Sequence, residues 1–355
     1  MGILNLNPFL GNFCPESTET LSIEKLKGKR VVIDASTMIH AEKSIATKIV
    51  VGETNLVKTG GQINQKKVQD LLKEQMLNKI ITILSKGVLP VLVYDGKPPP
   101  EKFSELKKRG DTKREKLDRI AVLQKKLAKA DPLDIPHTVV SELRQLLINY
   151  NRVTSDDYKA VKHIFNLLGL PQLQAKGEAE QLCSMLAREL LISAVISKDG
   201  DNLPLGCPLW LSPVNKGQYR AVNLKKALKI MDVSMPTFLD MCIMLGCDYN
   251  KRISGIGVMT VWKLLKEHRR INKLPKKYNT KCLKYKRCRE LFAPVSSESL
   301  IDSGSIHINR SAPIKNQVEL EKLGYNMMIF RFTSLYSSLP KIQHAQNISW
   351  VVMDE

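Results

Sequence analysis

The fold is decided by two short apolar runs, VVID at residues 31–34 and PVLVYD at residues 90–95, each of which ends on an aspartate. Runs of this length and β-branched composition are typical of buried strands in a parallel sheet. Between them, residues 68–87 carry apolar side chains at helical spacing and end at a glycine, which predicts a helix. The order strand, helix, strand predicts a β-α-β unit.

The same pattern returns further along the chain. Residues 154–169 begin with capping residues, continue as an amphipathic helix and end at a glycine before the short strand LPQLQA at 170–175. A helix over 178–191 then leads into the apolar run ISAVIS at 192–197, which is followed by another aspartate, Asp199. The sequence therefore predicts a second α/β half.

Composition describes a globular protein with a basic surface. The chain has 355 residues, of which 43% are hydrophobic and 25% charged, and this excludes disorder, collagen and coiled coil. The length allows two domains or one large α/β domain. The net charge of +20 predicts a polyanionic partner, with an anionic membrane surface as the alternative.

Several features weaken the membrane alternative. No apolar run reaches the ~18 residues that a membrane span requires, and the N-terminus lacks the basic start and apolar core of a signal peptide. Leu6 stands where a myristoylation signal needs Ser or Thr. The seven cysteines are odd in number and never spaced C-x-x-C. We therefore expect a reduced, intracellular protein without membrane contact.

Two stretches carry much of the positive charge. Residues 97–129 hold twelve Lys or Arg and five acids on a helical pattern with little apolar face, which is not typical of a core helix. Residues 250–289 hold fourteen Lys or Arg and a single acid, Glu267, with three aromatic residues between them. A solvated face is an equal alternative for the first stretch, whereas the near absence of acids in the second favours nucleic-acid binding.

Seven carboxylates follow strands or stand at helix ends. They are Asp34, Asp95, Glu178, Glu180, Asp199, Asp201 and Asp248. Ligands of an open α/β sheet bind outside the carboxyl ends of its strands, so we expect these groups to converge in one crevice. There they stay ionised only beside a cation, and an all-oxygen set favours Mg2+ or Mn2+ over zinc.

Each acid taken singly also fits a helix cap, a turn or a loop. The set predicts metal-assisted phosphodiester cleavage, in which two ions about 4 Å apart hold the attacking and leaving oxygens.

The loop after Asp248 adds a feature that suits phosphate binding. Gly255 and Gly257 flank Ile256 directly before an amphipathic helix, so backbone N–H groups can hold a phosphate without reading a base. A simple helix–helix turn is an equal alternative, but basic residues on both sides favour the DNA backbone.

Six motifs, in order and spacing, resemble those of the flap endonuclease family, the XPG-type structure-specific 5′ nucleases. They are MGI at the start, VVIDAS, VLVYDGKPPP, KGEAEQLC, SKDGDNL and MLGCDYNKRISGIG, and the resemblance covers about residues 1–270. It implies a PIN-like nuclease fold, in which a mixed, mostly parallel twisted sheet is flanked by helices, with a helical arch over the active site and a helix-two-turn-helix DNA-binding element. It also implies two Mg2+ ions, for which Mn2+ can substitute, and hydrolysis at single-strand/duplex junctions that leaves a 5′ phosphate and a 3′ hydroxyl.

The resemblance divides the chain as follows. We expect a nuclease domain at 1–270 and a basic C-terminal extension at 271–355. Within the nuclease domain we expect an N-terminal region at 1–107, the helical arch at 97–150, and an internal region at 154–270 with the helix-two-turn-helix at 238–268.

The resemblance also assigns individual site residues, position by position. The resemblance assigns all seven acids to metal binding, and we expect Asp34, Asp95, Glu178 and Asp199 among them to be catalytic. Lys102 and Arg109, seven and fourteen residues after Asp95, match the basic pair that approaches the scissile phosphate from the arch. The expected DNA-binding residues are Gly2, His40, Lys108, Lys113, Arg114, Lys251, Arg252, Gly255, Gly257, Lys263 and Lys266.

Three further points qualify the match. His40 stands where the family often has a stacking Tyr, and Pro204 and Leu205 stand where it usually has a Thr-Phe-like pair. The resemblance implies a K+ ion at the loop around Ile256. The C-terminus lacks a recognisable sliding-clamp motif.

The first function predicted is a Mg2+-dependent 5′ flap endonuclease with 5′-to-3′ exonuclease activity in DNA replication, repair or recombination. We expect a monomer acting on branched or flapped duplex DNA, in the nucleus or a cytoplasmic DNA-replication compartment. One alternative within the superfamily is an exonuclease or a four-way-junction nuclease. An alternative from another class is a catalytically inactive DNA-binding scaffold, against which the presence of all seven acids argues.

Overall fold

The computed structural model describes residues 2–129, 131, 135–150, 152–189, 192–215, 217–294, 301–303, 306–339 and 351–354. In this part of the chain an eight-stranded mixed sheet runs in the order β1-β7-β6-β5-β2-β3-β4-β8. Its strands are β1 (Thr18–Ser22), β2 (Arg30–Asp34), β3 (Leu89–Tyr94), β4 (Gln172–Ala175), β5 (Ala194–Ile196), β6 (Leu209–Asn215), β7 (Gln218–Asn223) and β8 (Ile301–Ser303). A separate pair joins β9 (Ile306–Ile308) to β10 (Val351–Asp354).

The centre of the sheet is parallel and its edges are antiparallel. β2 pairs in parallel with both β3 and β5, β3 with β4, and β5 with β6, whereas β1, β7 and β8 pair antiparallel. Asp34 lies opposite Val93 in this register. Because parallel strands end at the same edge, the residues that follow β2, β3 and β5 meet there. The predicted mixed, mostly parallel sheet is confirmed.

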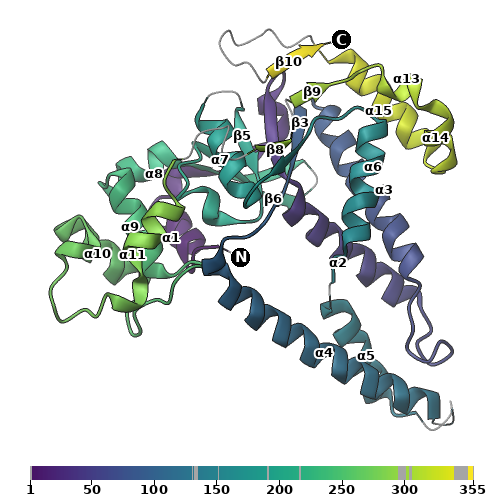
Figure 1. The fold of residues 1–355 in the computed structure, drawn as a ribbon, viewed down its shortest axis with the longest axis horizontal. Helices are drawn as coiled ribbons and strands as arrows, with labels where there is room; N and C mark the ends of the chain where they lie inside the picture. The colour runs from purple at the N-terminus through teal and green to yellow at the C-terminus, as the bar shows by residue number, and fades with distance from the viewer. Residues whose placement is uncertain are drawn as a thin grey trace.

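Helices cover both faces of the sheet (Figure 1). In β2, Val32 packs into one core cluster while Val31 and Ile33 pack into the other, as the alternation of side chains along a strand requires. The first cluster is completed by α1 (Leu6–Phe13), α7 (Ala179–Arg188), α8 (Leu224–Met231) and α9 (Met235–Leu245). The second is completed by α2 (Ala35–Glu53), α3 (Gln65–Leu84), α6 (Ser155–Leu167) and α15 (Asn326–Ser338).

Smaller helices extend the two layers. α10 (Val258–His268) and α11 (Tyr285–Leu291) add to the first, and α13 (Ala312–Lys315) and α14 (Gln317–Lys322) lie near α15 (Figure 1). The predicted strands at 31–34 and 90–95 are β2 and β3, and the helix predicted over 68–87 is α3.

A helical hairpin projects from the body of the molecule (Figure 1). It consists of α4 (Phe103–Lys129) and α5 (His137–Asn149). The buried residues of α4 all lie in its second half and pack with Leu143 and Leu147 of α5 and with the residues that end and follow α2. The first half of α4 has no buried residue, which agrees with the expectation that this basic helix is not a core helix.

A buried ion pair joins α2 to α6, two of the helices on one face of the sheet. The N-terminus of α6 has the predicted capping box, in which Thr154 and Asp157 each accept a hydrogen bond from the other's backbone N–H. Lys43 of α2 donates to the same Asp157 carboxylate, and the two side chains are only 9% and 3% exposed. Burial raises the pKa of Asp157, but the hydrogen bonds from Lys43 and Thr154 outweigh it and the net pKa is lowered.

We expect Lys43→Met to lower the free energy of unfolding by about 3 kcal/mol, because it leaves the buried Asp157 carboxylate without its counter-charge. Lys67→Met is the matched control, since Lys67 pairs with Glu53 at the surface, where both side chains are more than half exposed. That change should cost less than about 1 kcal/mol. Chemical denaturation followed by circular dichroism measures both, and equal losses would contradict a stabilising role for the buried pair.

Candidate active site

The carboxyl ends of the parallel strands open into one cavity of about 750 Å3. Six of the seven acids singled out in the sequence line it: Asp34, Asp95, Glu178, Glu180, Asp199 and Asp248. The seventh, Asp201, is buried beside Asp199 in the short helical turn Gly200–Asn202. β2, β3, β5, α7 and the loop after α9 thus bring together groups that are spread over more than 200 residues of sequence.

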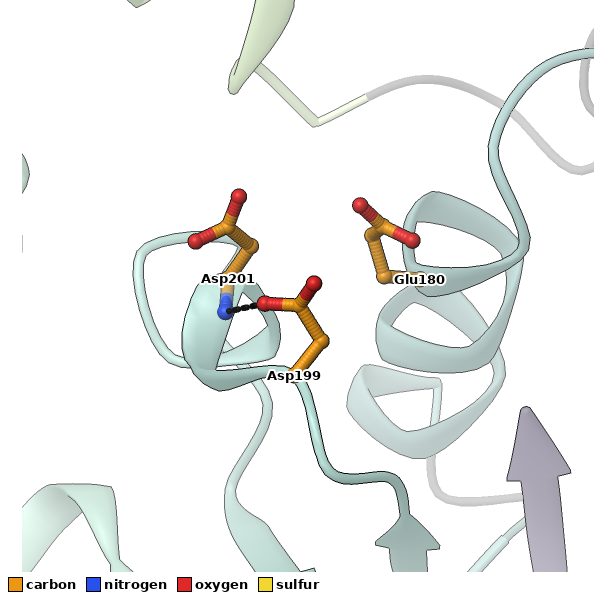
Figure 2. A group of neighbouring side chains, drawn as sticks. All are labelled: Glu180, Asp199 and Asp201. Atoms are coloured by element: carbon orange, nitrogen blue, oxygen red, sulfur yellow. Dashed lines mark hydrogen bonds between the residues drawn. The ribbon is translucent and has the colours of Figure 1, made fainter. Parts of the chain in front are cut away.

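Three of these acids form a compact group. One carboxylate oxygen each from Glu180, Asp199 and Asp201 lies within 4.8 Å of the other two. Figure 2 shows them facing a common space, with the backbone N–H of Asp201 donating to Asp199 Oδ1. Oδ1 of Asp201 is buried and has no hydrogen-bond partner among the described residues. An unsatisfied buried oxygen within three carboxylates fits a hard divalent cation, which prefers oxygen ligands.

Burial and mutual repulsion disfavour the ionised forms of these acids. Burial, reinforced by the charge of Asp95, raises the pKa of Asp34 to about 7. Burial and then the charges of Glu178 and Asp199 raise the pKa of Glu180 well above its usual value. Burial and then Asp199 and Asp248 do the same to the pKa of Asp201. A divalent cation would reverse these shifts, since an adjacent positive charge favours the carboxylate.

Two of the acids are oriented by hydrogen bonds from the sheet edge. Asp34 accepts from the backbone N–H of Thr37 at 3.0 Å and from Ser197 Oγ at 3.0 Å. Asp95 accepts from the backbone N–H of Ala179, at the start of α7, at 2.8 Å. These donors fix where the carboxylates point before any ligand binds.

Cations from the base of the hairpin reach into the cavity. Lys102 pairs with Glu178 and lies 3.3 Å from Asp248, and Arg109 Nη2 lies 3.0 Å from each oxygen of Asp248. Burial lowers the pKa of Lys102, but the charges of Glu180 and Glu178 outweigh it and the net pKa is raised. Lys102 is therefore a fixed positive charge at the mouth of the acidic site.

The other residues expected on the hairpin side fall into two groups. His40, Lys108 and Lys113 line the cavity. Burial and then the charge of Lys113 lower the pKa of His40, so its imidazole is neutral at physiological pH. Arg114 does not line the cavity; it is exposed and pairs with Asp111 at 3.0 Å.

Gly2 lies against the compact acid group. Its φ of +95° is a conformation that other residues adopt at a cost, and a Cβ there would sit 2.5 Å from Asp199 Oδ1 and 2.9 Å from the backbone nitrogen of Gly200. Only glycine lets the N-terminal segment approach the site this closely.

The second set of expected DNA-binding residues lies on α10 and the loop before it, away from the hairpin (Figure 1). Gly255 has a φ of +76° and Gly257 caps the N-terminus of α10. Lys251, Arg252, Lys263 and Lys266 are exposed. Lys266 also lies 3.7 Å from Asp232 and 5.4 Å from the ring centre of Trp262. The structure therefore separates an acidic cavity from a basic surface.

Sequence reasoning missed two residues that contact the acids. Tyr249 donates its hydroxyl to Glu178, and Ser197 donates to Asp34. The available signal was position, because Tyr249 directly follows Asp248 and Ser197 ends the run ISAVIS. Leu205, which departs from the family pattern, is buried in the same core cluster as Leu203. The chain next to Asp201 is therefore packed against the core.

Residues 1–116 match the XPG N-terminal domain and residues 169–248 match the XPG I-region. The chain is 34% identical over 286 residues to flap endonuclease 1 of Cryptosporidium muris, covering 76% of this chain and 56% of the relative. It is 31% identical over 282 residues to flap endonuclease 1 of Meyerozyma guilliermondii, covering 78% and 70%. The chain thus spans little more than half the length of the first relative. It belongs to the flap endonuclease family of the XPG type.

Solved structures share the fold. Flap endonuclease-1 from Methanococcus jannaschii superimposes with a TM-score of 0.60 at 21% identity, over 92% of this chain and 98% of that one. The catalytic core of Rad2 in complex with a DNA substrate gives 0.57 at 15% identity, over 94% and 99%. None of the helices in the described ranges combines the length and apolar character that crossing a membrane requires.

Gly2→Ala should weaken divalent-ion binding about tenfold or more, because a Cβ would displace Asp199 and strain the backbone. Isothermal titration with Mn2+ measures the affinity. Gly52→Ala is the control, since a Cβ at Gly52 meets nothing within 4 Å. Unchanged Mn2+ affinity in Gly2→Ala would show that the close approach of Gly2 does not shape the site.

Proposed function

We propose that this chain is a Mg2+-dependent, structure-specific DNA nuclease that cuts 5′ flaps at single-strand/duplex junctions, with additional 5′-to-3′ exonuclease activity. The observation that carries the proposal is the acidic cavity closed on one side by Lys102 and Arg109. The names of its relatives, flap endonuclease 1, support the flap preference. DNA replication, repair or recombination inside the cell is the setting in which such substrates arise.

The acids would hold two divalent ions. We assign Glu180, Asp199 and Asp201, which offer oxygens within 4.8 Å of one another, to one Mg2+, with Mn2+ as a substitute. On the family resemblance the remaining acids, Asp34, Asp95, Glu178 and Asp248, complete the two-ion site. When bound, paired divalent ions activate water and neutralise charge on the phosphate. On the family resemblance we take Asp34, Asp95, Glu178 and Asp199, all of which line the cavity, as the catalytic acids.

Residues of the hairpin would hold the scissile phosphate and the flanking nucleotide. Lys102 and Arg109 are preorganised cations, and their charge stabilises the negative charge that develops on the phosphate oxygens. Neutral His40 offers a flat ring for a base to stack on. Lys108 and Lys113 add phosphate contacts inside the cavity, and we retain Arg114 as a contact on the outer side of α4.

The basic surface around α10 would grip the duplex. Lys251, Arg252, Lys263 and Lys266 neutralise backbone phosphates, and the loop at Gly255 and Gly257 presents N–H groups at a helix N-terminus. We also place a K+ ion at this loop, on the family resemblance. Such contacts hold DNA of any sequence, which suits an enzyme that recognises structure.

Cleavage of end-labelled flap, nicked, gapped and four-way DNA in Mg2+ tests the substrate assignment. We expect the flap to be cut fastest, to a 5′ phosphate and a 3′ hydroxyl. Faster cutting of four-way or nicked DNA would favour the other nucleases of the superfamily, and binding without cutting would favour an inactive scaffold.

Asp199→Asn should abolish cleavage and leave flap binding intact or tighter. The change keeps the shape of the side chain but removes a metal-facing charge, and it relieves repulsion of the DNA phosphate. Single-turnover rates and fluorescence anisotropy measure the two effects. A variant that still cuts at more than a few per cent of the wild-type rate would contradict the assignment of Asp199 as a catalytic metal ligand.

Lys251→Ala combined with Lys263→Ala should flatten the dependence of log affinity on log salt by up to about two units, because each phosphate contact contributes about 0.9. Single-turnover cleavage at saturating enzyme should stay near wild type. Lys315→Ala combined with Lys322→Ala is the control, since these exposed lysines lie on α13 and α14, far from α10 (Figure 1). If both double variants gave the same slope of log affinity against log salt, the α10 surface would be a solvated face that does not contact DNA phosphates.

A further inference from the structure

Helix α11 is anchored to the core by a buried carboxylate. Asp240 of α9 is fully buried and accepts from Arg289 of α11 at 2.7 and 2.6 Å. Arg270 lies 3.1 Å from the same carboxylate, and the backbone N–H of Ile271 donates to it at 3.1 Å. Because α9 leads directly into the loop of Asp248, this anchor fixes α11 relative to the acidic cavity.

From this anchor α11 reaches the base of the hairpin. Arg287 Nε lies 2.6 Å from Glu101 Oε1, in the short helical turn Pro100–Lys102. Glu101 directly precedes Lys102, whose ammonium group contacts Glu178 and Asp248. The ion pair therefore holds the backbone turn that presents Lys102 to the cavity.

The end of α11 contacts two residues that adjoin the acids, Gln181 and Tyr249. Gln181, next to Glu180 on α7, donates its side-chain amide to the backbone oxygen of Leu291 at 3.1 Å. The ring of Phe292 packs edge-on against Tyr249 at a centroid distance of 5.5 Å, and the Tyr249 hydroxyl donates to Glu178. Ile271, Leu283, Cys288 and Phe292 are buried in the same core cluster as α7 and α9.

We propose that residues 285–292 form a brace that positions Lys102 and Glu178, with Arg287 and Tyr249 as positioning residues that do not touch the DNA phosphate. The proposal rests on the nuclease function proposed above. It assigns a structural part of the active site to a segment expected to lie in the C-terminal extension.

The brace acts through orientation. The Arg287 side chain is 51% exposed and that of Glu101 22%, and a partly exposed pair contributes little to overall stability. A small displacement of a group that acts on the reacting phosphate is costly nonetheless, because catalytic cations work only in a narrow geometry. Loss of the pair should therefore change the rate of the chemical step more than it changes folding or binding.

Arg287→Ala is the direct test, with Lys286→Ala as its matched control. Lys286 is an exposed neighbour on α11, so its removal deletes the same charge and leaves the Glu101 contact intact. At saturating enzyme we expect Arg287→Ala to slow single-turnover flap cleavage about fivefold to tenfold, with flap affinity and the melting temperature matching those of Lys286→Ala. Arg287→Lys, which keeps a donor for Glu101, should recover part of the rate.

A double-mutant cycle with Glu101→Gln shows whether the two residues act together. If they do, the double variant should be no slower than either single variant. Additive losses, or an Arg287→Ala variant that cuts at the wild-type rate, would overturn the brace. So would a parallel fall in affinity and rate in both Arg287→Ala and Lys286→Ala, since that pattern describes ordinary phosphate contacts.

Tyr249→Phe tests the second arm. It removes only the hydroxyl that holds Glu178 and keeps the ring against Phe292. We expect a rate loss of about tenfold with unchanged flap affinity, whereas Tyr285→Phe, which removes a hydroxyl on α11 itself, should be neutral. Equal rates in both variants would overturn this arm.

A wild-type protein that cuts none of the DNA structures would refute the proposed function. An active wild-type protein whose Arg287 and Tyr249 variants are unaffected would refute the brace alone.

Discussion

The active site depends on seven carboxylates held together at the carboxyl ends of the parallel strands. Burial, together with their mutual repulsion, raises the pKa of Asp34 to about 7 and those of Glu180 and Asp201 well above their usual values. Such a site is tolerable only where positive charge compensates it. Lys102 and Arg109 supply part of that charge from the hairpin, and the orphaned oxygen of Asp201 indicates where a divalent ion supplies more.

The architecture separates the tasks of the structure-specific nuclease that we propose. The sheet fixes the acids, the hairpin brings cations over them, and α10 carries a basic surface some distance away (Figure 1). Because acids and cations come from different elements, the complete site exists only when the hairpin base is in place. In our account, residues 285–292 keep it there through Arg287 and Glu101.

The sequence was informative where local patterns carry the signal. The apolar runs ending at Asp34 and Asp95, the capping box at Thr154 and the ordered acidic motifs predicted the strands, helix α6 and the convergence of the acids. The contacts of α11 could not be predicted in this way. Glu101 and Arg287 are 186 positions apart, and Asp240 and Arg289 are 49 apart. No periodicity links such residues, and a cation within a basic stretch gives no sign that it faces an acid.

The most direct test of the account is to locate the metal ions. Anomalous diffraction from crystals of the protein soaked in Mn2+ should give two peaks about 4 Å apart, one of them among Glu180, Asp199 and Asp201 and both within the acidic cavity. Crystals of Asp199→Asn should lose at least one of the two. Peaks elsewhere on the protein, or a cavity without any Mn2+ at millimolar concentration, would contradict the claim that the carboxylates form a two-metal nuclease centre.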